Sequence, residues 1–161
     1  KYLPNKLAID YIVDFLMPKL IKKYPNLKLV LTGGGYEKKQ KFLLNLGIVK
    51  KPKLLNLMYN SEMMIVPLIK GTGTRIKIIE GLLIGTNILS TYKGIEGINR
   101  INKHKFPIIA KKSKFYEIIS KFVYKNHGKE VIEDYLKKYS MENIVKKFFN
   151  NSYVKKTFKT N

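Results

Sequence analysis

Cysteine is absent from this 161-residue chain. Disulfide bonds and thiolate metal sites are therefore excluded, and the redox compartment cannot be inferred from the sequence. Long apolar runs are missing as well. The longest stretches, such as "EMMIVPLI" and "KLVLTG", are far too short to span a bilayer.

No secretory leader is recognisable at the start of the chain. The segment "KYLPNKLAIDYIVDFLMPKL" interleaves charges with two prolines and lacks a small-residue cleavage site. We therefore expect a cytoplasmic location. The length and a hydrophobic content of 45% fit one compact domain, residues 1–161, and the initial Lys in place of Met leads us to expect a fragment of a longer protein.

Acidic residues and arginine are also scarce. There are 32 basic residues against 11 acidic ones, which gives a net charge of +21, yet only Arg75 and Arg100 are arginines. Such a charge favours anionic partners, but base and phosphate recognition usually recruits arginine. Nucleic acid is thus not the expected partner. An anionic membrane surface fits better and would make the protein peripheral on the cytoplasmic face.

Apolar segments separated by amphipathic ones predict the secondary structure. A buried helix is expected over about Asn5–Lys23, with a kink at Pro18. Buried strands are predicted in "KLVLTGGG", "EMMIVPL", "TNILST" and "FPIIA". The segment "KFLLNLGIV" is ambiguous between a helix end and a strand, and its Gly47, Ile48 and Val49 favour a strand. Further helices are predicted in "PKLLNLMYN", "SKFYEIISKFVYK", "GKEVIEDYLKKYS" and "MENIVKKFFNN".

Strands without polar alternation, separated by helices, indicate a parallel sheet covered on both faces. The predicted fold is therefore α/β: a doubly wound, Rossmann-like parallel sheet followed by C-terminal helices. In such folds ligands bind at the carboxyl ends of the strands. Both glycine clusters, Gly33–Gly35 and Gly71/Gly73, directly follow predicted strands and should lie at that edge.

The second glycine cluster belongs to the motif "IKGTGTRIKIIEGLLIG", residues 69–85. It matches neither a Walker motif nor a complete dinucleotide fingerprint. What remains is a strand, a loop of small residues and a helix start whose free N–H groups can receive an anion. On these grounds alone the loop is either an anion site or a plain tight turn.

Glu80 is the one carboxylate of this motif. On a helix that starts near Arg75, it lies at the edge of an apolar stripe formed with Ile79 and Leu83. A carboxylate in that position needs hydrogen-bond donors. A lysine or backbone partner would supply them, and so would the hydroxyl groups of a ligand such as a ribose.

The stretch "PLIKGTGTRIKIIEGLLIGTNILSTYKGIEGI", residues 67–98, resembles the donor-site segment of GT-B glycosyltransferases of the large family 4, or group 1, type. "YLPNKLAIDYIVDFLMPKLIKKYPNLKLVLTGGG" is similar to the opening of the same C-terminal domain, and "LGIVKKPKLLNLMYNSEMMIVPL" to its next stretch. "YLKKYSMENIVKKFFNNSY" resembles its closing helices, with Met141 where tryptophan is common.

The resemblance implies a retaining, metal-independent transfer from a nucleoside-diphosphate sugar, with no cofactor. Arg75 and Lys77 would be catalytic, because they could neutralise the leaving nucleoside diphosphate. Ile48 and Val49 would lie against the base, and Glu80 would bind the ribose hydroxyls. The donor-binding residues implied by the resemblance are Gly34, Gly35, Gly71, Thr72, Gly73, Thr74, Arg75, Ile76 and Glu80.

The chain also departs from the family pattern. Thr72 stands where the family often has a first glutamate, and a Lys-Gly pair that helps the phosphates is replaced around Pro4-Asn5. The resemblance places the first strand of the domain and the N-terminal acceptor domain outside this chain, so we expect the N-terminal domain as a partner and no transfer by these residues alone.

Two other functions stay open: a nucleotide-sugar 2-epimerase, which shares the fold, and a non-catalytic degenerate module that binds membranes or polyanions. Glu96 is a candidate donor-side contact in a loop at the crevice edge. His104 and His127 are expected to be solvated, and Asp10 and Asp14 to form a solvated helix edge.

Overall fold

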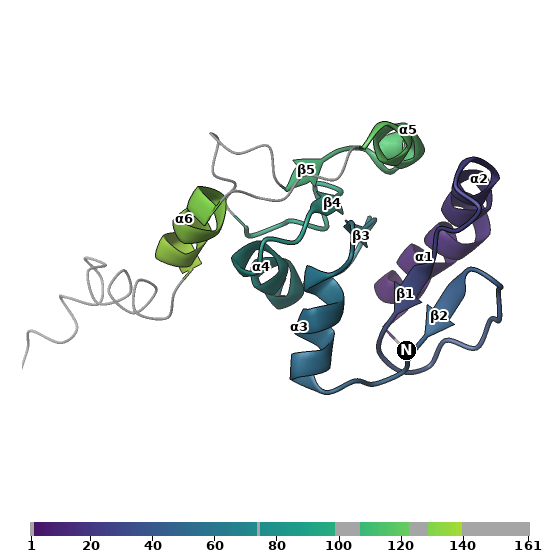
Figure 1. Cartoon of the computed structure of the whole chain (residues 1–161), viewed down its shortest axis with the longest axis horizontal. Coiled ribbons are helices and arrows are strands. Elements are labelled where there is room, and N and C mark those ends of the chain that lie inside the picture. The colour runs from purple at the N-terminus through teal and green to yellow at the C-terminus, as the bar shows by residue number, and fades with distance from the viewer. Residues whose placement is uncertain (1, 74, 99–106, 123–128, 140–161) are drawn as a thin grey trace, which may run out of the picture.

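The computed structural model describes residues 2–73, 75–98, 107–122 and 129–139 (Figure 1). The chain is a mixed α/β protein whose short strands are all parallel to their neighbours. Thr74, Arg100, His104, His127 and the predicted helix "MENIVKKFFNN" lie outside the described residues.

The first helix is longer and less regular than predicted. It consists of α1 (Leu3–Tyr11), a π-helical segment η1 (Ile12–Leu16) and α2 (Met17–Lys23). Pro18 lies in the first turn of α2, so the irregularity comes directly before the proline, whose missing N–H cannot continue the regular ladder. The expectation of burial all round is wrong, because Leu7 and Phe15 are exposed on one flank.

The strands form two small sheets. In the first, β1 (Leu29–Leu31) pairs with β2 (Leu43–Asn45). In the second, β4 (Ile88–Ser90) lies between β3 (Met64–Val66) and β5 (Ile108–Ile109), with Leu89 opposite Ile65 and Ile108. The prediction of parallel pairing is confirmed, whereas a single continuous sheet is not seen, because β1 and β3 are not hydrogen-bonded to each other.

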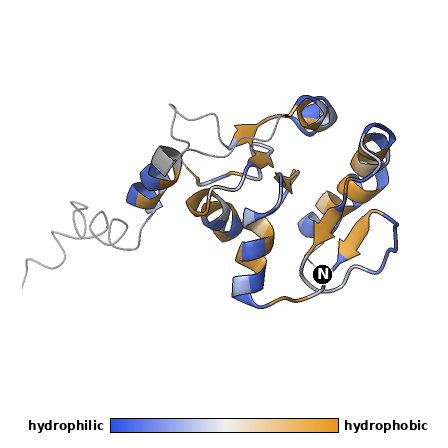
Figure 2. Ribbon diagram, viewed as in Figure 1, coloured by the Kyte–Doolittle hydropathy of each residue, from blue (hydrophilic) through white to orange (hydrophobic). Residues whose placement is uncertain are grey.

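Helices cover both faces of the three-stranded sheet. On one face Ile65, Leu89 and Ile108 pack in a cluster with the first helix and with Phe115 of α5 (Phe115–Lys121). On the other face Ile88 packs with α4 (Ile76–Leu83) and with Tyr135 of α6 (Lys129–Tyr139). The alternation follows the two-residue period of a strand, and Figure 2 shows that the strands are the most hydrophobic part of the ribbon.

Most predicted elements are confirmed, with shifted ends. The helix predicted in "PKLLNLMYN" is α3 (Lys51–Tyr59), and a three-residue 3-10 turn, η2 (Lys112–Lys114), precedes α5. The strand in "KFLLNLGIV" exists as β2, but Gly47, Ile48 and Val49 follow it instead of forming it. Gly47 has φ +61°, which ends the strand and turns the chain.

Candidate functional site

The loop after β3 needs its glycines for two different reasons. Gly71 and Gly73 have φ of +108° and +106°, which side chains rarely adopt. A Cβ at Gly71 would also lie 2.8 Å from the hydroxyl oxygen of Tyr2, whereas a Cβ at Gly73 would meet nothing within 4 Å. The loop therefore packs against the start of α1 at Gly71 and is open at Gly73.

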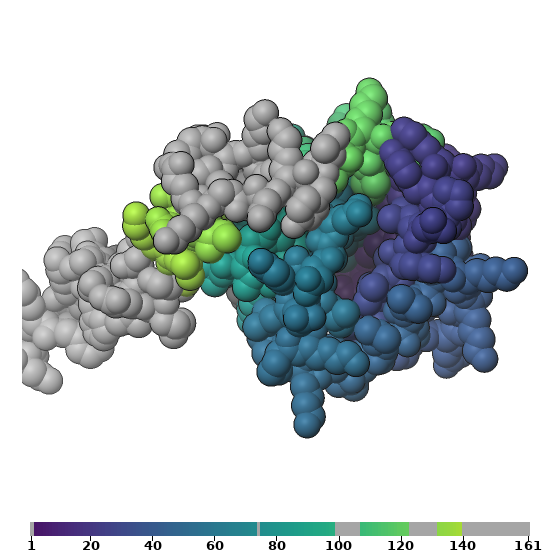
Figure 3. Space-filling model, in the orientation of Figure 1, coloured from purple at the N-terminus to yellow at the C-terminus, as the bar shows by residue number. Residues whose placement is uncertain are grey.

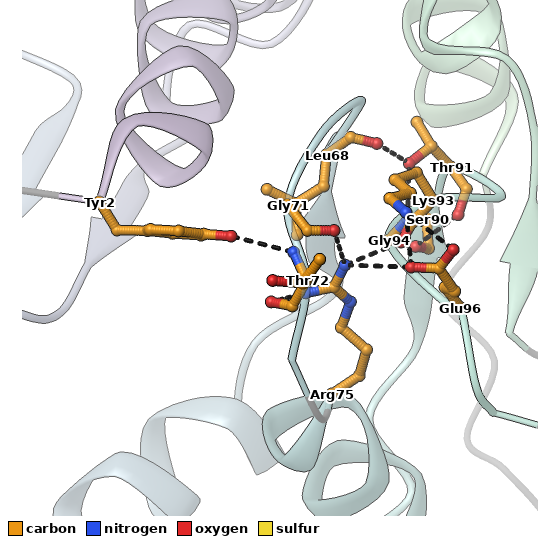
Figure 4. Close-up of polar contacts among 10 residues, drawn as sticks. All are labelled: Tyr2, Leu68, Gly71, Thr72, Arg75, Ser90, Thr91, Lys93, Gly94 and Glu96. Carbon is orange, nitrogen blue, oxygen red and sulfur yellow. Dashed lines mark hydrogen bonds and ion pairs between the residues drawn. The ribbon is translucent and has the colours of Figure 1, made fainter.

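Tyr2 also fixes the loop through a hydrogen bond. The backbone N–H of Thr72 donates to the Tyr2 hydroxyl at 3.0 Å (Figure 4). This amide is therefore not free to meet an anion. The amides of Gly73 and Arg75 and the first-turn amides of Ile76 and Lys77 have no partner among the described residues, and no side chain caps α4.

Arg75 is folded back onto its own loop. Its side chain is only 9% exposed. One guanidinium nitrogen donates to the carbonyls of Gly71 and Lys93, both at 3.2 Å, and the other donates to Thr72 at 3.4 Å. The planar fork thus ties the glycine loop to the turn after β4 (Figure 4). Its Nε is buried without a partner in the described part of the chain.

The turn after β4 is held by hydroxyl groups. Thr91 donates to the carbonyl of Leu68 and accepts the N–H of Gly94 at 3.0 Å, while Ser90 donates to the carbonyl of Thr91 at 3.0 Å. Gly94 packs tightly here, since a Cβ would lie 2.8 Å from the carbonyl oxygen of Val66. The ends of β3 and β4 are therefore locked together by side chains.

Glu96 borders this turn. Lys93 donates to its carboxylate at 2.7 Å, and the Arg75 guanidinium lies 4.0 Å away. The hydrogen bond from Lys93, with help from both positive charges, holds the pKa of Glu96 below its ordinary value. Glu96 is half exposed and already paired, so its candidacy as a donor contact stays a prediction.

Glu80 has the lysine partner that its position suggested. Its side chain is 20% exposed and forms an ion pair with the Lys51 ammonium at the start of α3. Only one carboxylate oxygen takes part in that pair, and within the described residues the other accepts no hydrogen bond. Since Lys51 is more than half exposed, a ligand hydroxyl could replace or join it.

Ile48 and Val49, which are expected near the base, lie in the turn after β2, and the donor-binding candidates Gly34 and Gly35 lie in the turn after β1. The Gly33 N–H donates to the Gly47 carbonyl at 2.6 Å, and a Cβ at Gly34 would lie 3.9 Å from Ile48. Gly35 has φ +78°. Ile48 is 88% exposed, which is unusual for a large apolar side chain.

The structure thus brings the predicted residues into two groups. The first group is the turn after β1 with Gly34 and Gly35, which lies beside Ile48 and Val49. The second group is the loop after β3 together with the start of α4, and it contains Gly71, Thr72, Gly73, Arg75, Ile76, Lys77 and Glu80. The Lys51–Glu80 pair links the two groups, because Lys51 begins α3 just after Ile48 and Val49.

Several residues of the site escaped the sequence reasoning. Their contacts join residues far apart in the sequence, which no local pattern indicates. The pairs are Tyr2 with Thr72, Lys51 with Glu80 and Thr91 with Leu68, at separations of 70, 29 and 23 residues. Gly94 could have been found, since a glycine four residues after a buried strand resembles the other turn glycines.

Within the described ranges, no group of three or more histidine or carboxylate side chains could hold a metal ion. In the same residues no helix is both long and apolar enough to cross a membrane. The chain matches no known family profile, no curated protein and no solved structure.

Proposed function

We propose that this chain is the donor-binding half of a retaining GT-B glycosyltransferase, which moves a sugar from a nucleoside diphosphate to an acceptor. The observation that carries the proposal is the mostly buried Glu80 carboxylate, whose second oxygen accepts no hydrogen bond within the described residues. Its first oxygen pairs with Lys51, which follows the exposed Ile48 by three residues. A nucleoside needs this combination, an apolar surface for its base and an acceptor for its ribose hydroxyls.

The phosphates would meet the loop that starts at Gly73. The start of α4 has no side-chain cap, so its first amides carry partial positive charge that an anion can meet. The exposed Lys77 lies in the first turn of the same helix. Lys77 would neutralise the leaving diphosphate. Arg75 would add its positive charge from its buried position under the loop, whose backbone it holds through the Gly71 and Lys93 carbonyls.

The second candidate is a non-catalytic degenerate module that binds membranes or polyanions. Thr72 favours it, because a hydroxyl cannot replace the carboxylate that the family often uses on the donor sugar. The first candidate predicts specific nucleotide binding by this chain and sugar transfer by the protein that contains it, whereas the second predicts neither.

We also propose that the two sheets belong to one doubly wound sheet with a further parallel strand between β1 and β3. The first helix begins beside the loop after β3, through the Tyr2–Thr72 bond, and leads into the amino end of β1. A helix of this direction normally connects two neighbouring parallel strands. β1 pairs with β2 alone, so its other edge is open among the described residues, whereas β4 has a paired strand on each side. The single-neighbour strand β1 is less buried than β4, which is buried throughout.

This strand proposal is testable by fusion. Joining a five-residue valine- and isoleucine-rich segment ahead of the first helix by a short turn should raise the melting temperature. The same fusion with a central proline is the control, because proline cannot donate within a central strand. Equal melting temperatures for the two fusions would contradict the proposal.

The function is tested by titrating UDP, GDP and ADP into the chain by calorimetry. We expect weak binding of one diphosphate and about tenfold weaker binding by Glu80→Ala, because hydrogen bonds to a charged group are lost. Glu117→Ala on α5 is the matched control and should bind like the wild type. Equal affinity of Glu80→Ala and wild type would remove the ribose role, and robust transfer by the chain alone would contradict its assignment as half of a site.

A further inference from the structure

One flank of the first helix carries exposed apolar residues at one end and lysines at the other. Leu3, Leu7 and the 64%-exposed Phe15 are uncovered. Lys19 and Lys22 continue the stripe one and two turns later, at spacings of four and three residues. The whole molecule is lysine-rich, but within the described residues this helix places its lysines next to an exposed phenylalanine.

Two hollows follow this flank. The first, of about 230 Å³, is lined mainly by apolar side chains that include Leu7, Phe15 and Ile69. The second is open and shallow, of about 500 Å³, and is lined by Lys19, Lys22, Lys23 and Tyr116. Helices α2 and α5 lie side by side (Figures 1 and 3), and the second hollow is lined from both of them.

The charges that face this flank are mostly positive and unneutralised. Lys23 donates to the carbonyl of Ser120 at 2.8 Å, and the Lys112 ammonium lies 4.4 Å from the centre of the Tyr11 ring. Neither contact removes a charge. Lys19 and Lys22 have no partner in the described residues. Of the nearby carboxylates, Asp14 pairs with Lys38 at 2.7 Å. Asp10 lines the first hollow and lies 3.8 Å from the same ammonium, so it is the one negative charge named in the lining of either hollow.

We propose that this flank, defined as Leu3, Leu7, Phe15, Lys19, Lys22 and Tyr116, binds the surface of a bilayer that contains anionic phospholipids. Lysine ammonium groups attract the headgroups over a Debye length. Exposed apolar side chains and the rim tyrosine enter the interface, where both apolar and polar ends are satisfied. Nucleic-acid sites usually use arginine, whose guanidinium binds phosphates and bases through two hydrogen bonds. Both arginines of this chain lie outside the first helix and α5.

The test is co-sedimentation of the chain with sucrose-loaded vesicles of 70% phosphatidylcholine and 30% phosphatidylserine. We expect wild type to bind these vesicles and not pure phosphatidylcholine, and to be released by 0.5 M salt. Lys19→Gln/Lys22→Gln should bind about 30-fold more weakly. Phe15→Ser should lose affinity several-fold, and circular dichroism should show that both variants remain folded.

The control is Lys50→Gln/Lys53→Gln, which removes the same charge from exposed positions around the start of α3. It should bind within about threefold of wild type. Equal losses in the two double variants would overturn the proposal, because they would show a diffuse charge effect. Absence of vesicle binding, or binding of a single-stranded oligonucleotide in its place with the same lysine dependence, would overturn it as well.

Discussion

The two glycine loops at the ends of the strands are built in opposite ways. The loop at Gly71–Gly73 is held by the buried Arg75 fork, by Tyr2 and by the hydroxyl of Thr91. The turn at Gly33–Gly35 is joined to the end of β2 by the backbone bond from Gly33 to Gly47 and by Asn45, which donates to the Tyr36 carbonyl at 2.6 Å. Beside it, Ile48 is almost fully exposed. The difference indicates that the first loop is preorganised, whereas the second leaves an apolar surface uncovered.

Preorganised amides and an uncovered apolar surface suit different parts of one ligand. Amides fixed before binding cost little reorganisation when they meet an anion. An exposed isoleucine gains most when a flat ring covers it. The comparison therefore supports the division of the proposed site into a phosphate end and a base end.

The largest effect is expected from Gly94→Ala. Its Cβ would lie 2.8 Å from the Val66 carbonyl oxygen, which belongs to a strand and cannot move away cheaply. We expect a loss of about 3 kcal/mol in the free energy of unfolding, measured by urea denaturation. Gly94 lies in the turn after β4, to which Arg75 and Thr91 tie the Gly71–Gly73 loop. Gly34→Ala in the Gly33–Gly35 turn is the control, since its Cβ would only touch Ile48. Similar losses of unfolding free energy at both positions would mean that the support of the Gly71–Gly73 loop is packed no more tightly than the Gly33–Gly35 turn.

Arg75→Met comes next. It removes the donors that satisfy the Gly71, Thr72 and Lys93 carbonyls. We expect a loss of about 2 kcal/mol, and little recovery in Arg75→Lys because an ammonium cannot bridge three carbonyls. Thermal and urea unfolding measure this loss, and the control is Lys77→Met, which should leave the free energy of unfolding nearly unchanged. An unchanged free energy of unfolding in Arg75→Met would mean that the Arg75 guanidinium does not stabilise the loop.

Tyr2→Phe removes one hydrogen bond and keeps the ring. The loss of the bond from the Thr72 amide should cost about 1 kcal/mol. The control is Tyr92→Phe, at an exposed position of the turn after β4, which should not change the free energy of unfolding measurably. The free Thr72 amide would also exchange its hydrogen faster in Tyr2→Phe, and unchanged exchange would contradict the contact.

The smallest effect concerns Glu96. Because Lys93 holds its pKa below the ordinary 4.5 in the folded state, its ion pair stabilises the protein above pH 4.5. That contribution is lost as the pH falls through the lowered pKa. The melting temperature of wild type should therefore exceed that of Glu96→Gln slightly at pH 7, and the difference should shrink as the pH falls below 4.5. A difference between the two melting temperatures that does not change as the pH falls would show that it has another cause.

The sequence predicted the strands and most helices because apolar runs and glycine turns are local signals. It did not predict that β1–β2 and β3–β5 are separate sheets, since pairing depends on contacts between distant segments. The apolar residues of Asn5–Lys23 predict a buried helix, and only the structure shows which flank of it is covered and that Phe15 is exposed.

The same limit applies to the candidate site. Its glycine loop and Glu80 follow from spacing, and the lysine alternative for Glu80 was open from the sequence, but the identity of Lys51 depends on how α3 packs near α4. Arg75 illustrates the opposite case. Its position beside a glycine loop suggests a ligand contact, while its neighbours in space are carbonyl groups of the protein itself.

The most direct test of the account compares a nucleoside diphosphate with its 2′-deoxy form, in wild type and in Glu80→Gln. The diphosphate that binds most tightly in the first titration is used. If Glu80 accepts a bond from the ribose, wild type should bind the deoxy form about tenfold more weakly, and Glu80→Gln should bind the two forms with nearly equal affinity. A wild type that does not discriminate between them would contradict the central claim.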